Sequence, residues 1–179
     1  MKDPNTQIAQ FVSNTVTAIG LLFKAKLYGQ TTILMYSAIE TMGLLDAPPS
    51  QSKATGATFK AWVTKYILTD PRLTFSDVDL WGARCAVLHT FTTASDLSND
   101  GKAKEIIFFV GKPDDPMMQA AFAATRDVGK GTHIPALLDD FVDAFLAGIE
   151  KFMDDLIANC EKDSAYSIRL SKVLQHHMM

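Results

Sequence analysis

The stretch Pro135-Ala-Leu-Leu-Asp-Asp-Phe-Val-Asp-Ala-Phe-Leu-Ala-Gly-Ile-Glu-Lys-Phe-Met-Asp-Asp-Leu-Ile-Ala-Asn-Cys160 decides the fold class of this chain. Its apolar residues recur at helical spacing: Leu138, Phe141, Val142, Phe145, Ile149, Phe152, Met153, Leu156 and Ile157. Acidic residues such as Asp143 and Glu150 occupy the opposite face, and proline is favoured in a first helical turn. The spacing therefore predicts one long amphipathic helix from Pro135 to Cys160 that packs against other helices.

Other helical patterns precede and follow this segment. Apolar residues recur with helical spacing over about 5–26, 30–45 and 59–67, and the segment 30–45 is apolar nearly all round, as a central helix is. Gly29 predicts the break between the first two helices. Ser76, with Asp79 three residues later, is typical of a helix start with a shortened capping box, so a fourth helix is expected over about 76–91. A last short helix is predicted over about 166–175.

The segment 94–134 interrupts the helical pattern. Glu105–Val110 is a short run rich in β-branched and aromatic residues, which predicts a strand. Thr132–Ile134 is expected to pair with it, and a short helix is expected around Met117–Thr125. We therefore predict a mainly all-α fold: a bundle of five to six helices with a small two-stranded β insertion, forming one domain over residues 1–179.

Composition excludes several classes of protein. The 179 residues are 47% hydrophobic and 21% charged, which is ordinary for a globular domain and excludes a disordered chain or a fibre. Lys and Arg number 17 and Asp and Glu number 20, giving a net charge of −3. This balance disfavours a nonspecific nucleic-acid binder, which is usually basic.

The cysteine content and the N-terminal sequence bear on the cellular location. Cys85 and Cys160 are too few for a disulfide framework and are expected to be reduced. The start Met1-Lys2-Asp3-Pro4 is not typical of a signal peptide, and the uncharged stretch that follows contains too many polar residues for a spanning helix. We expect a cytoplasmic protein that does not contact a membrane.

Several weak motifs are better explained by structure than by chemistry. Gly129-Lys-Gly-Thr132 has neither the first glycine nor the preceding strand of a phosphate loop, so a turn is the simpler interpretation. The acidic residues near the start of the long helix are typical of a solvated helix face, and no histidine or cysteine spacing indicates a metal site. No metal or cofactor is therefore expected. Cys85 with His89 four residues later could form a nucleophile and base, but a small buried cysteine is the simpler interpretation.

Arg84-Cys-Ala-Val-Leu-His89 carries the strongest chemical signal. An arginine on an apolar helix is usually paired or faces a site, and a histidine five residues later lies about 140° around the helix and about 7.5 Å along it. A neutral histidine can exchange a proton with a ribose hydroxyl, and an arginine can hold a phosphate. On the pattern alone, a structural arginine paired with Glu40 or Asp79 is the simpler interpretation.

Three segments together resemble the HEPN (higher eukaryotes and prokaryotes nucleotide-binding) family, whose members are all-α bundles with an Arg-x(4–6)-His motif on a late core helix. They are Tyr36-Ser-Ala-Ile-Glu-Thr-Met-Gly43, Phe59-Lys-Ala-Trp-Val-Thr-Lys-Tyr66 and Asp79-Leu-Trp-Gly-Ala-Arg-Cys-Ala-Val-Leu-His89. The resemblance implies a metal-independent RNA endonuclease that acts as a homodimer, with Arg84 and His89 of both chains in one composite site. It also implies cleavage by 2′-hydroxyl attack that leaves a cyclic phosphate.

The resemblance further implies a toxin or antiviral effector, with RNA as substrate and an antitoxin or regulatory protein as a possible partner. We name Glu40, Asp79, Cys85 and Thr90 as supporting positions. Two departures from the family pattern stand out. Cys85 replaces the polar residue that often follows the arginine, and Phe91 replaces a tyrosine that some members carry two residues after the histidine.

Two rival functions stay open at this point. The chain could be a non-catalytic dimeric or partner-binding scaffold in which the arginine and histidine are structural, or it could bind a small nucleotide in a cleft between helices. Both tryptophans, Trp62 and Trp81, lie on apolar stripes, and we expect both to be largely buried.

Overall fold

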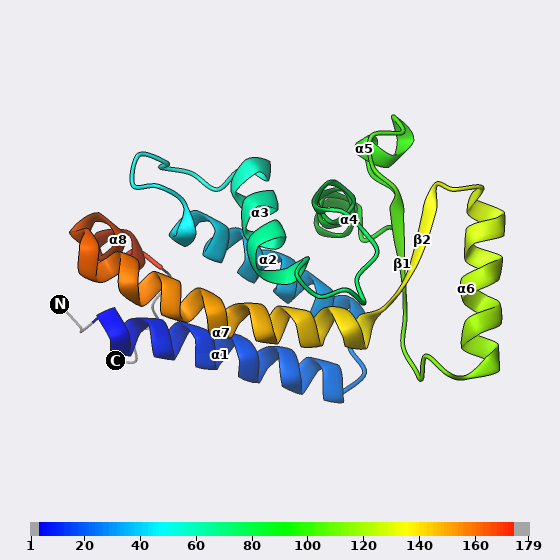
Figure 1. Cartoon of the computed structure of the whole chain (residues 1–179), viewed down its shortest axis with the longest axis horizontal. Helices are drawn as coiled ribbons and strands as arrows, with labels where there is room; N and C mark the ends of the chain where they lie inside the picture. Colours follow the sequence, from blue (N-terminus) through cyan, green and yellow to red (C-terminus); the bar gives the residue numbers. More distant parts are fainter. Residues whose placement is uncertain (1–3, 174–179) are drawn as a thin grey trace. The chain divides into compact units, whose positions relative to one another are not determined.

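The computed structural model describes residues 4–173, together with the side chains of all of them except Pro4, Asn5 and Thr90. It confirms a mainly helical fold with a small β insertion: eight α-helices and a two-stranded sheet lie within the described residues (Figure 1). In chain order the elements are α1 (Pro4–Lys24), α2 (Tyr28–Asp46), α3 (Gly56–Trp62), a π-helical turn (Val63–Ile67), α4 (Asp77–Thr90), α5 (Asp96–Asn99), β1 (Glu105–Phe109), α6 (Pro116–Gly129), β2 (His133–Leu137), α7 (Leu138–Lys162) and α8 (Ser164–Leu170).

The chain divides into two compact units. The first unit comprises the described residues up to Trp62 and those from Gly148 onward, and the second unit comprises Val63–Ala147. Helix α7 contributes its C-terminal part to the first unit and its first turns to the second. The single domain expected over residues 1–179 stays a prediction.

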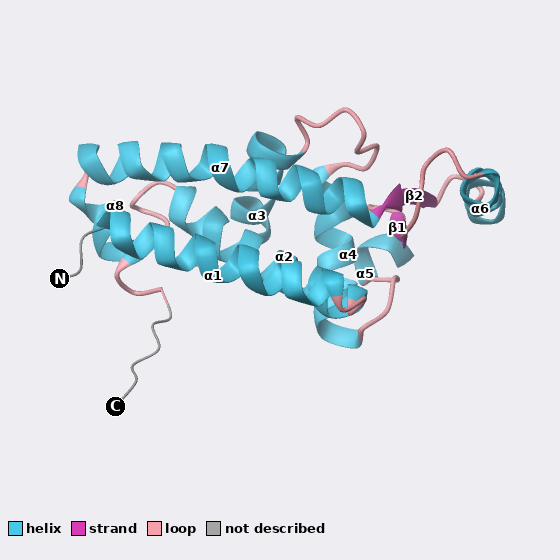
Figure 2. Ribbon diagram, turned by 90° about the horizontal axis from the view of Figure 1, so that it is seen from below, coloured by secondary structure: helices cyan, strands magenta, loops and turns pink. Residues whose placement is uncertain are grey.

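Within the residues described, the first unit consists of helices joined by loops and contains no strand (Figure 2). Helix α2 packs against α1, α3 and α8, and it is buried over most of its length, as expected for a central helix. Trp62 is fully buried and meets Phe152 edge-on at 5.9 Å between ring centroids. Gly43 lets α2 approach α3 closely, because a Cβ atom there would lie 2.6 Å from the carbonyl oxygen of Thr58.

The second unit is built around a β–α–β motif. Strands β1 and β2 pair in parallel, with Glu105 opposite His133 and Phe109 opposite Leu137, and α6 lies beside β2 (Figure 1). Parallel pairing follows from the connection, because a crossover helix returns the chain to the same end of the sheet. Phe75, Phe108 and Phe141 pack together in the core, with ring centroids 5.4–6.3 Å apart.

The structure corrects two expected boundaries. The break between α1 and α2 falls at residues 25–27, where Lys26 has φ 60, and Gly29 lies inside α2. The long helix begins at Leu138 rather than Pro135, because β2 continues through Pro135 to Leu137. Proline is tolerated there since the sheet has only two strands and each is an edge. The polar segment before β1 also contains the short helix α5, which Ser95 caps.

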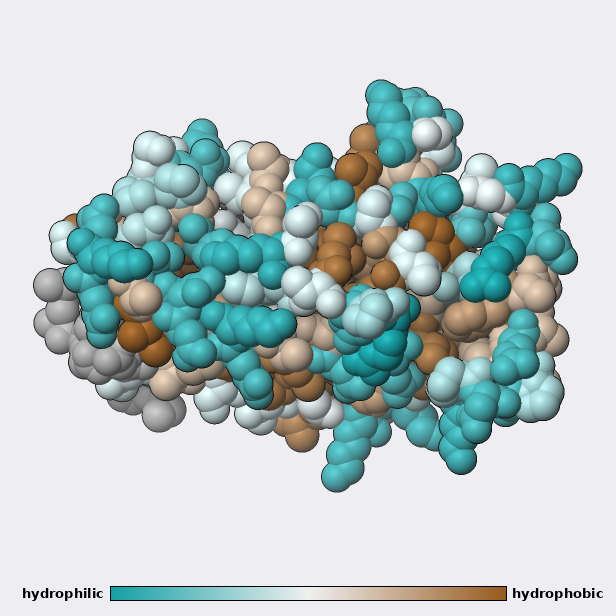
Figure 3. All heavy atoms as spheres, viewed as in Figure 1, coloured by the Kyte–Doolittle hydropathy of each residue, from teal (hydrophilic) through white to brown (hydrophobic). Residues whose placement is uncertain are grey.

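The hydrophilic residues of α7 lie on its exposed side, as the helical periodicity predicts. Hydrophilic residues line the exposed side of α7 (Figure 3), where Asp143, Glu150 and Asp154 are exposed. Within residues 4–173, none of the helices has both the length and the apolar character that crossing a membrane requires.

Candidate functional site

Helix α4 positions the Arg84–His89 pair, and its start is fixed by the capping box that the sequence predicted. The Ser76 side chain accepts from the backbone N–H of Asp79, and the Asp79 side chain accepts from the backbone N–H of Ser76. These reciprocal bonds satisfy two donors at the helix terminus. The helix therefore begins at a defined residue, which sets the rotation of every later side chain on α4.

The carboxylate of Asp79 accepts hydrogen bonds from backbone N–H groups. Its Oδ2 accepts from the N–H of Ser76 at 2.9 Å and from the Ser76 hydroxyl at 2.6 Å, and its Oδ1 accepts from the N–H of Lys104 at 2.6 Å. The residue is buried, with 8% of its surface exposed. Asp79 thus ties the start of α4 to the segment that enters β1, which is a structural contribution to the site.

Arg84 is half-buried and lies against an aromatic ring of its own helix. Its guanidinium carbon is 4.9 Å from the centroid of the Trp81 ring, and its Nε atom is buried. Helical side chains lean toward the N-terminus, so residues three apart meet in this way. Trp81 was expected to be largely buried, but it is only half-buried, and the Arg84 guanidinium lies over the ring.

His89 lies on a different part of α4. Five residues after Arg84, it is rotated by about 140° and displaced by about 7.5 Å toward the C-terminus, whereas the Arg84 guanidinium extends the other way, over Trp81. His89 is exposed. A single chain therefore presents the two side chains on separate faces, and a site that uses both needs a second copy of α4 or a new Arg84 rotamer.

The face of α4 that carries Arg84 is partly exposed to solvent. Trp81, Arg84, Cys85 and Leu88 are all half-buried and lie within an arc of about 100° on the helix. Cys85 is a free thiol. The arrangement combines two apolar side chains with one cation and one thiol.

Helix α4 is followed by Phe91, whose phenyl ring is exposed. Phe91 caps the helix with φ 55 and ψ 34, and its N–H donates to the carbonyl of Val87 at 3.0 Å. The side chain is 61% exposed. The supporting position Thr90 lies between this residue and His89, and its side chain is outside the described part of the chain.

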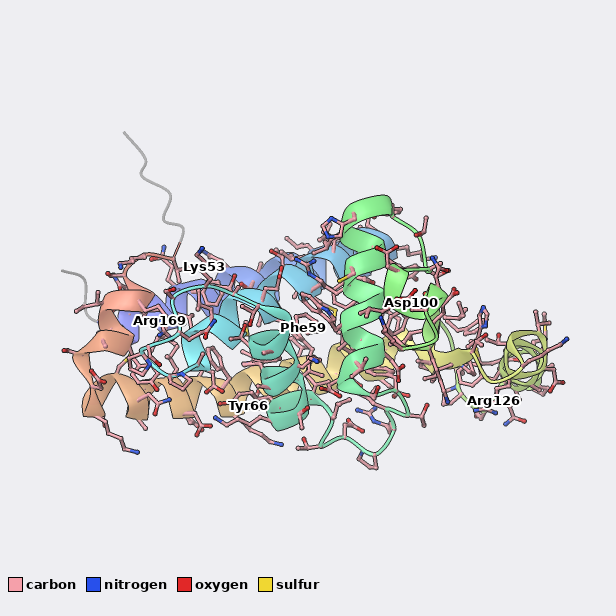
Figure 4. The ribbon with its side chains drawn as sticks, turned by 90° about the horizontal axis from the view of Figure 1, so that it is seen from above. Lys53, Phe59, Tyr66, Asp100, Arg126 and Arg169 are labelled. Carbon is pink, nitrogen blue, oxygen red and sulfur yellow. The ribbon has the colours of Figure 1, made fainter. Side chains whose placement is uncertain are left out.

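Glu40 belongs to the first unit, not to the unit that holds α4. It is half-buried on α2 and lines an open groove of about 1090 Å³ between α1, α2, α8 and the loop after α2. Arg169, labelled in Figure 4, comes from α8 at this groove. Its guanidinium donates to the carbonyls of Leu44, Ala47, Pro48 and Gln51 at 2.5–3.0 Å, which joins α8 to the end of α2.

The other described histidine is part of the sheet. Nδ1 of His133 lies 2.8 Å from the Thr132 hydroxyl, and its Nε2 lies 3.8 Å from a carboxylate oxygen of Glu105. Thr132 also donates to the carbonyl of Gly129 at 2.6 Å, so the Gly129–Thr132 segment is a turn, as the sequence indicated. Among the residues described, no group of three or more His, Cys, Asp or Glu side chains is placed to hold a metal ion.

Comparisons of the chain with protein-family models, with curated proteins and with solved structures gave no match. The HEPN resemblance therefore rests on the sequence segments quoted above. The structure shows where the two motif residues lie. The Arg84 guanidinium lies over Trp81 on a half-buried face of α4, and His89 is exposed near the C-terminal end of the same helix.

Proposed function

We propose that this chain is a metal-independent RNA endonuclease of the HEPN type. In this proposal, two copies pair and Arg84 and His89 of both form one composite site. The observation that carries the proposal is the placement of the motif on α4, with an exposed imidazole at one end and a positioned guanidinium on the neighbouring face. An imidazole and a guanidinium brought together on one phosphodiester can supply the proton transfer and the charge stabilisation for cleavage without a metal.

The proposed chemistry needs only groups that these side chains and RNA supply. The imidazole of His89 takes the proton of a ribose 2′-hydroxyl, and the 2′ oxygen attacks the adjacent phosphorus. The bond from phosphorus to the 5′ oxygen breaks, that oxygen takes a proton from the imidazolium formed at His89, and a 2′,3′-cyclic phosphate is left on the other fragment. The guanidinium of Arg84 pairs with the phosphate oxygens and offsets the charge that builds on them.

Pairing of two chains is supported by the half-buried face of α4. Trp81 and Leu88 are apolar and lie about two helical turns apart on this face, with Arg84 between them. Apolar side chains that one chain leaves partly exposed can be buried by a second copy, and a two-fold axis is the commonest way to bury the same surface on two chains. Light scattering is then expected to give about 39 kDa, twice the 19.6 kDa of one chain.

The direct test is cleavage of single-stranded oligoribonucleotides in the presence of EDTA, with analysis of the product termini. His89→Ala is expected to lower the rate by about 100-fold or more, and Arg84→Lys is expected to be damaging because an ammonium does not form a bidentate pair. Arg126→Lys is the matched control, since Arg126 lies on α6 and not on the motif helix (Figure 4), and it should leave the rate unchanged. Folded, dimeric wild-type protein that cleaves none of several RNAs would refute the proposal.

One observation favours a second function, that of a non-catalytic dimeric scaffold. The guanidinium of Arg84 already lies over Trp81, as it would if the arginine only stabilised its helix. The scaffold alternative predicts that Arg84→Lys lowers the melting temperature while no variant, and no wild-type preparation, cleaves RNA. Expression in bacteria separates the alternatives further, since a ribonuclease toxin should arrest growth and the His89→Ala variant should not.

A further inference from the structure

Helix α6 packs onto the small sheet through one apolar stripe (Figure 1). Phe122 meets Phe109 of β1 with ring centroids 5.3 Å apart. Gly129 lets the helix approach β2 closely, because a Cβ atom there would lie 2.6 Å from the Cβ atom of His133. The stripe covers an arc of about 60° on the helix and consists of half-buried or buried residues: Met118, Phe122, Thr125 and Gly129. The sheet therefore covers only one side of α6.

A second apolar stripe on α6 lies in solvent. Met117 and Val128 are each 81% exposed, more than any other large apolar side chain among the described residues. Ala120 and Ala124 are exposed between them, and Ala121 is half-buried. These five residues lie within an arc of about 100°, whose centre is roughly 110° from that of the first stripe. A surface helix usually carries charged and polar residues on such a face, so the fold of one chain does not explain this stripe.

The exposed stripe has the spacing of a seam between two helices. Four of its residues follow one another after four, three and four positions: Met117, Ala121, Ala124 and Val128. This is the spacing of the a and d positions of a coiled coil. The two central residues are alanines, and small side chains at a contact bring two helix axes close together. The larger Met117 and Val128 lie at the two ends of the seam, about 16 Å apart along the helix.

Charged residues occur only near the two ends of α6. Residues 116–125 contain none, in a chain of which 21% is charged. Residues 112–115 carry one lysine and two aspartates, a net charge of −1, and residues 126–130 carry one arginine, one aspartate and one lysine, a net charge of +1. About 20 Å of helix separates the two groups, so a single chain does not bring these opposite charges together. An antiparallel partner helix would do so.

We infer that α6 is a self-association surface, whose exposed stripe packs antiparallel against the same stripe of a second copy of this chain about a two-fold axis. In this register Met117 meets Val128 of the partner subunit, and Ala121 meets Ala124 of the partner subunit. The acidic end of each helix then faces the basic end of the other, whereas a parallel pair would bring like charges together. A second copy is the partner that fits, because the stripe complements itself in both spacing and charge.

This contact goes beyond the proposed function and does not depend on it. It uses α6, whereas the pairing proposed above uses the half-buried face of α4. A chain with two different two-fold contacts forms assemblies larger than a dimer, so the mass is expected to rise above that of two chains as the concentration increases. One helix pair makes a small interface of the weak class, and the association is therefore expected between about 10 µM and about 1 mM.

Sedimentation equilibrium of the full chain, from about 1 µM to about 1 mM, measures the association. The double variant Met117→Glu with Val128→Glu places carboxylates opposite one another across the axis, which is expected to weaken the association through α6 by about 100-fold or more. Both side chains are 81% exposed, so the variant should fold, and its melting temperature checks this. Gln119→Glu is the matched control, since it adds a carboxylate at an exposed position on the side of α6 opposite the stripe, and it should leave the association unchanged.

Disulfide cross-linking tests the register. In a background with Cys85→Ala and Cys160→Ala, the Ala121→Cys and Ala124→Cys variants are incubated with oxidised glutathione, separately and as a mixture. The antiparallel register predicts a cross-linked dimer mainly in the mixture, because position 121 of one chain meets position 124 of the other. A parallel pair would instead link each variant to itself.

The outcomes separate this inference from the proposed function. Equal association of the wild type and the double Glu variant would assign the stripe to something other than a second copy and overturn the inference, and so would a wild type that stays monomeric over the whole range. Cross-linking of each cysteine variant only with itself would also overturn it. Loss of association in the double variant, with the Gln119→Glu control unchanged, supports the inference whether or not the wild type cleaves RNA. Cleavage that His89→Ala abolishes, together with unchanged association of the double variant, would leave the ribonuclease standing and this inference wrong.

Discussion

The guanidinium carbon of Arg84 lies 4.9 Å from the centroid of the Trp81 ring, three residues earlier on α4. A cation over an indole face is attracted by the ring quadrupole. The contact holds the arginine on the half-buried face of the helix and keeps its charge close to the surface. It also explains how a charged side chain is accommodated within an otherwise apolar helical pattern.

A double-mutant cycle measures this contact. Trp81→Leu, Arg84→Met and the double variant retain apolar bulk, so the cycle isolates the interaction between cation and ring. The coupling free energy from urea unfolding is expected to be about 0.5–1 kcal/mol, because the site is half-buried. Additive effects, with no coupling beyond experimental error, would mean that the ring and the guanidinium contribute independently.

Asp79 is expected to contribute to the free energy of unfolding and not to the chemical step. Its two oxygens accept from Ser76 and from the N–H of Lys104, so Asp79→Asn replaces one acceptor by a donor that faces other donors. The free energy of unfolding should fall by about 1–3 kcal/mol. Asp77→Asn is the matched control in the same first turn, where loss of the charge near the helix terminus should cost less than about 1 kcal/mol. Equal losses in the two variants would contradict the capping role.

Much of the fold could be predicted because its signals are local. The capping box at Ser76, the helical spacing of α7 and the β-branched run of β1 each act within a few residues, and each is present in the structure. The start of α7 could not be predicted, because proline is favoured in a first helical turn and is also tolerated on an edge strand, so Pro135 fits both. Pairing with β1 decides between them.

The candidate site was predictable only in part. Helical geometry alone predicts that the side chains of Arg84 and His89 point in different directions. In the structure the Arg84 guanidinium lies over Trp81, and the His89 side chain is exposed to solvent. The half-burial of Trp81 was missed, because an apolar stripe does not say which of its members lie in the core and which lie at a surface. Arg169 was also missed, since its four carbonyl acceptors lie more than 100 residues away in sequence.

Two glycines on neighbouring helices should respond to alanine in opposite directions. A Cβ atom at Gly43 would lie 2.6 Å from the carbonyl oxygen of Thr58, so Gly43→Ala forces α2 and α3 apart and should destabilise the chain by about 1–3 kcal/mol. A Cβ atom at Gly20 would meet no neighbouring atom within 4 Å, and alanine there should stabilise α1 by about 0.5–1 kcal/mol. Denaturant midpoints measure both changes, and destabilisation by Gly20→Ala would show that α1 is packed differently.

Tyr36 should make the protein lose stability in alkaline solution. Burial raises the pKa of its hydroxyl above the ordinary value near 10, because the phenolate would lose its hydration in the core. Above pH 10 the unfolded chain therefore releases a proton that the folded chain retains, so the unfolded state binds fewer protons and stability falls as pH rises. Below pH 10 both states keep the proton, and Tyr36 adds no pH dependence there.

The expected slope approaches about 1.4 kcal/mol per pH unit once the pH is well above 10. Urea unfolding of the wild type and of Tyr36→Phe at a series of pH values from about 8 to about 11.5 measures it. Phenylalanine cannot ionise, so the variant should lack this part of the slope while it keeps the contributions of other groups. Lys102 is one of them, since its pairing with Asp100 raises the pKa of its ammonium group, and its contribution is present in both proteins and cancels in the difference. Parallel curves for the two proteins above pH 10 would mean that the Tyr36 hydroxyl reaches water in the folded state.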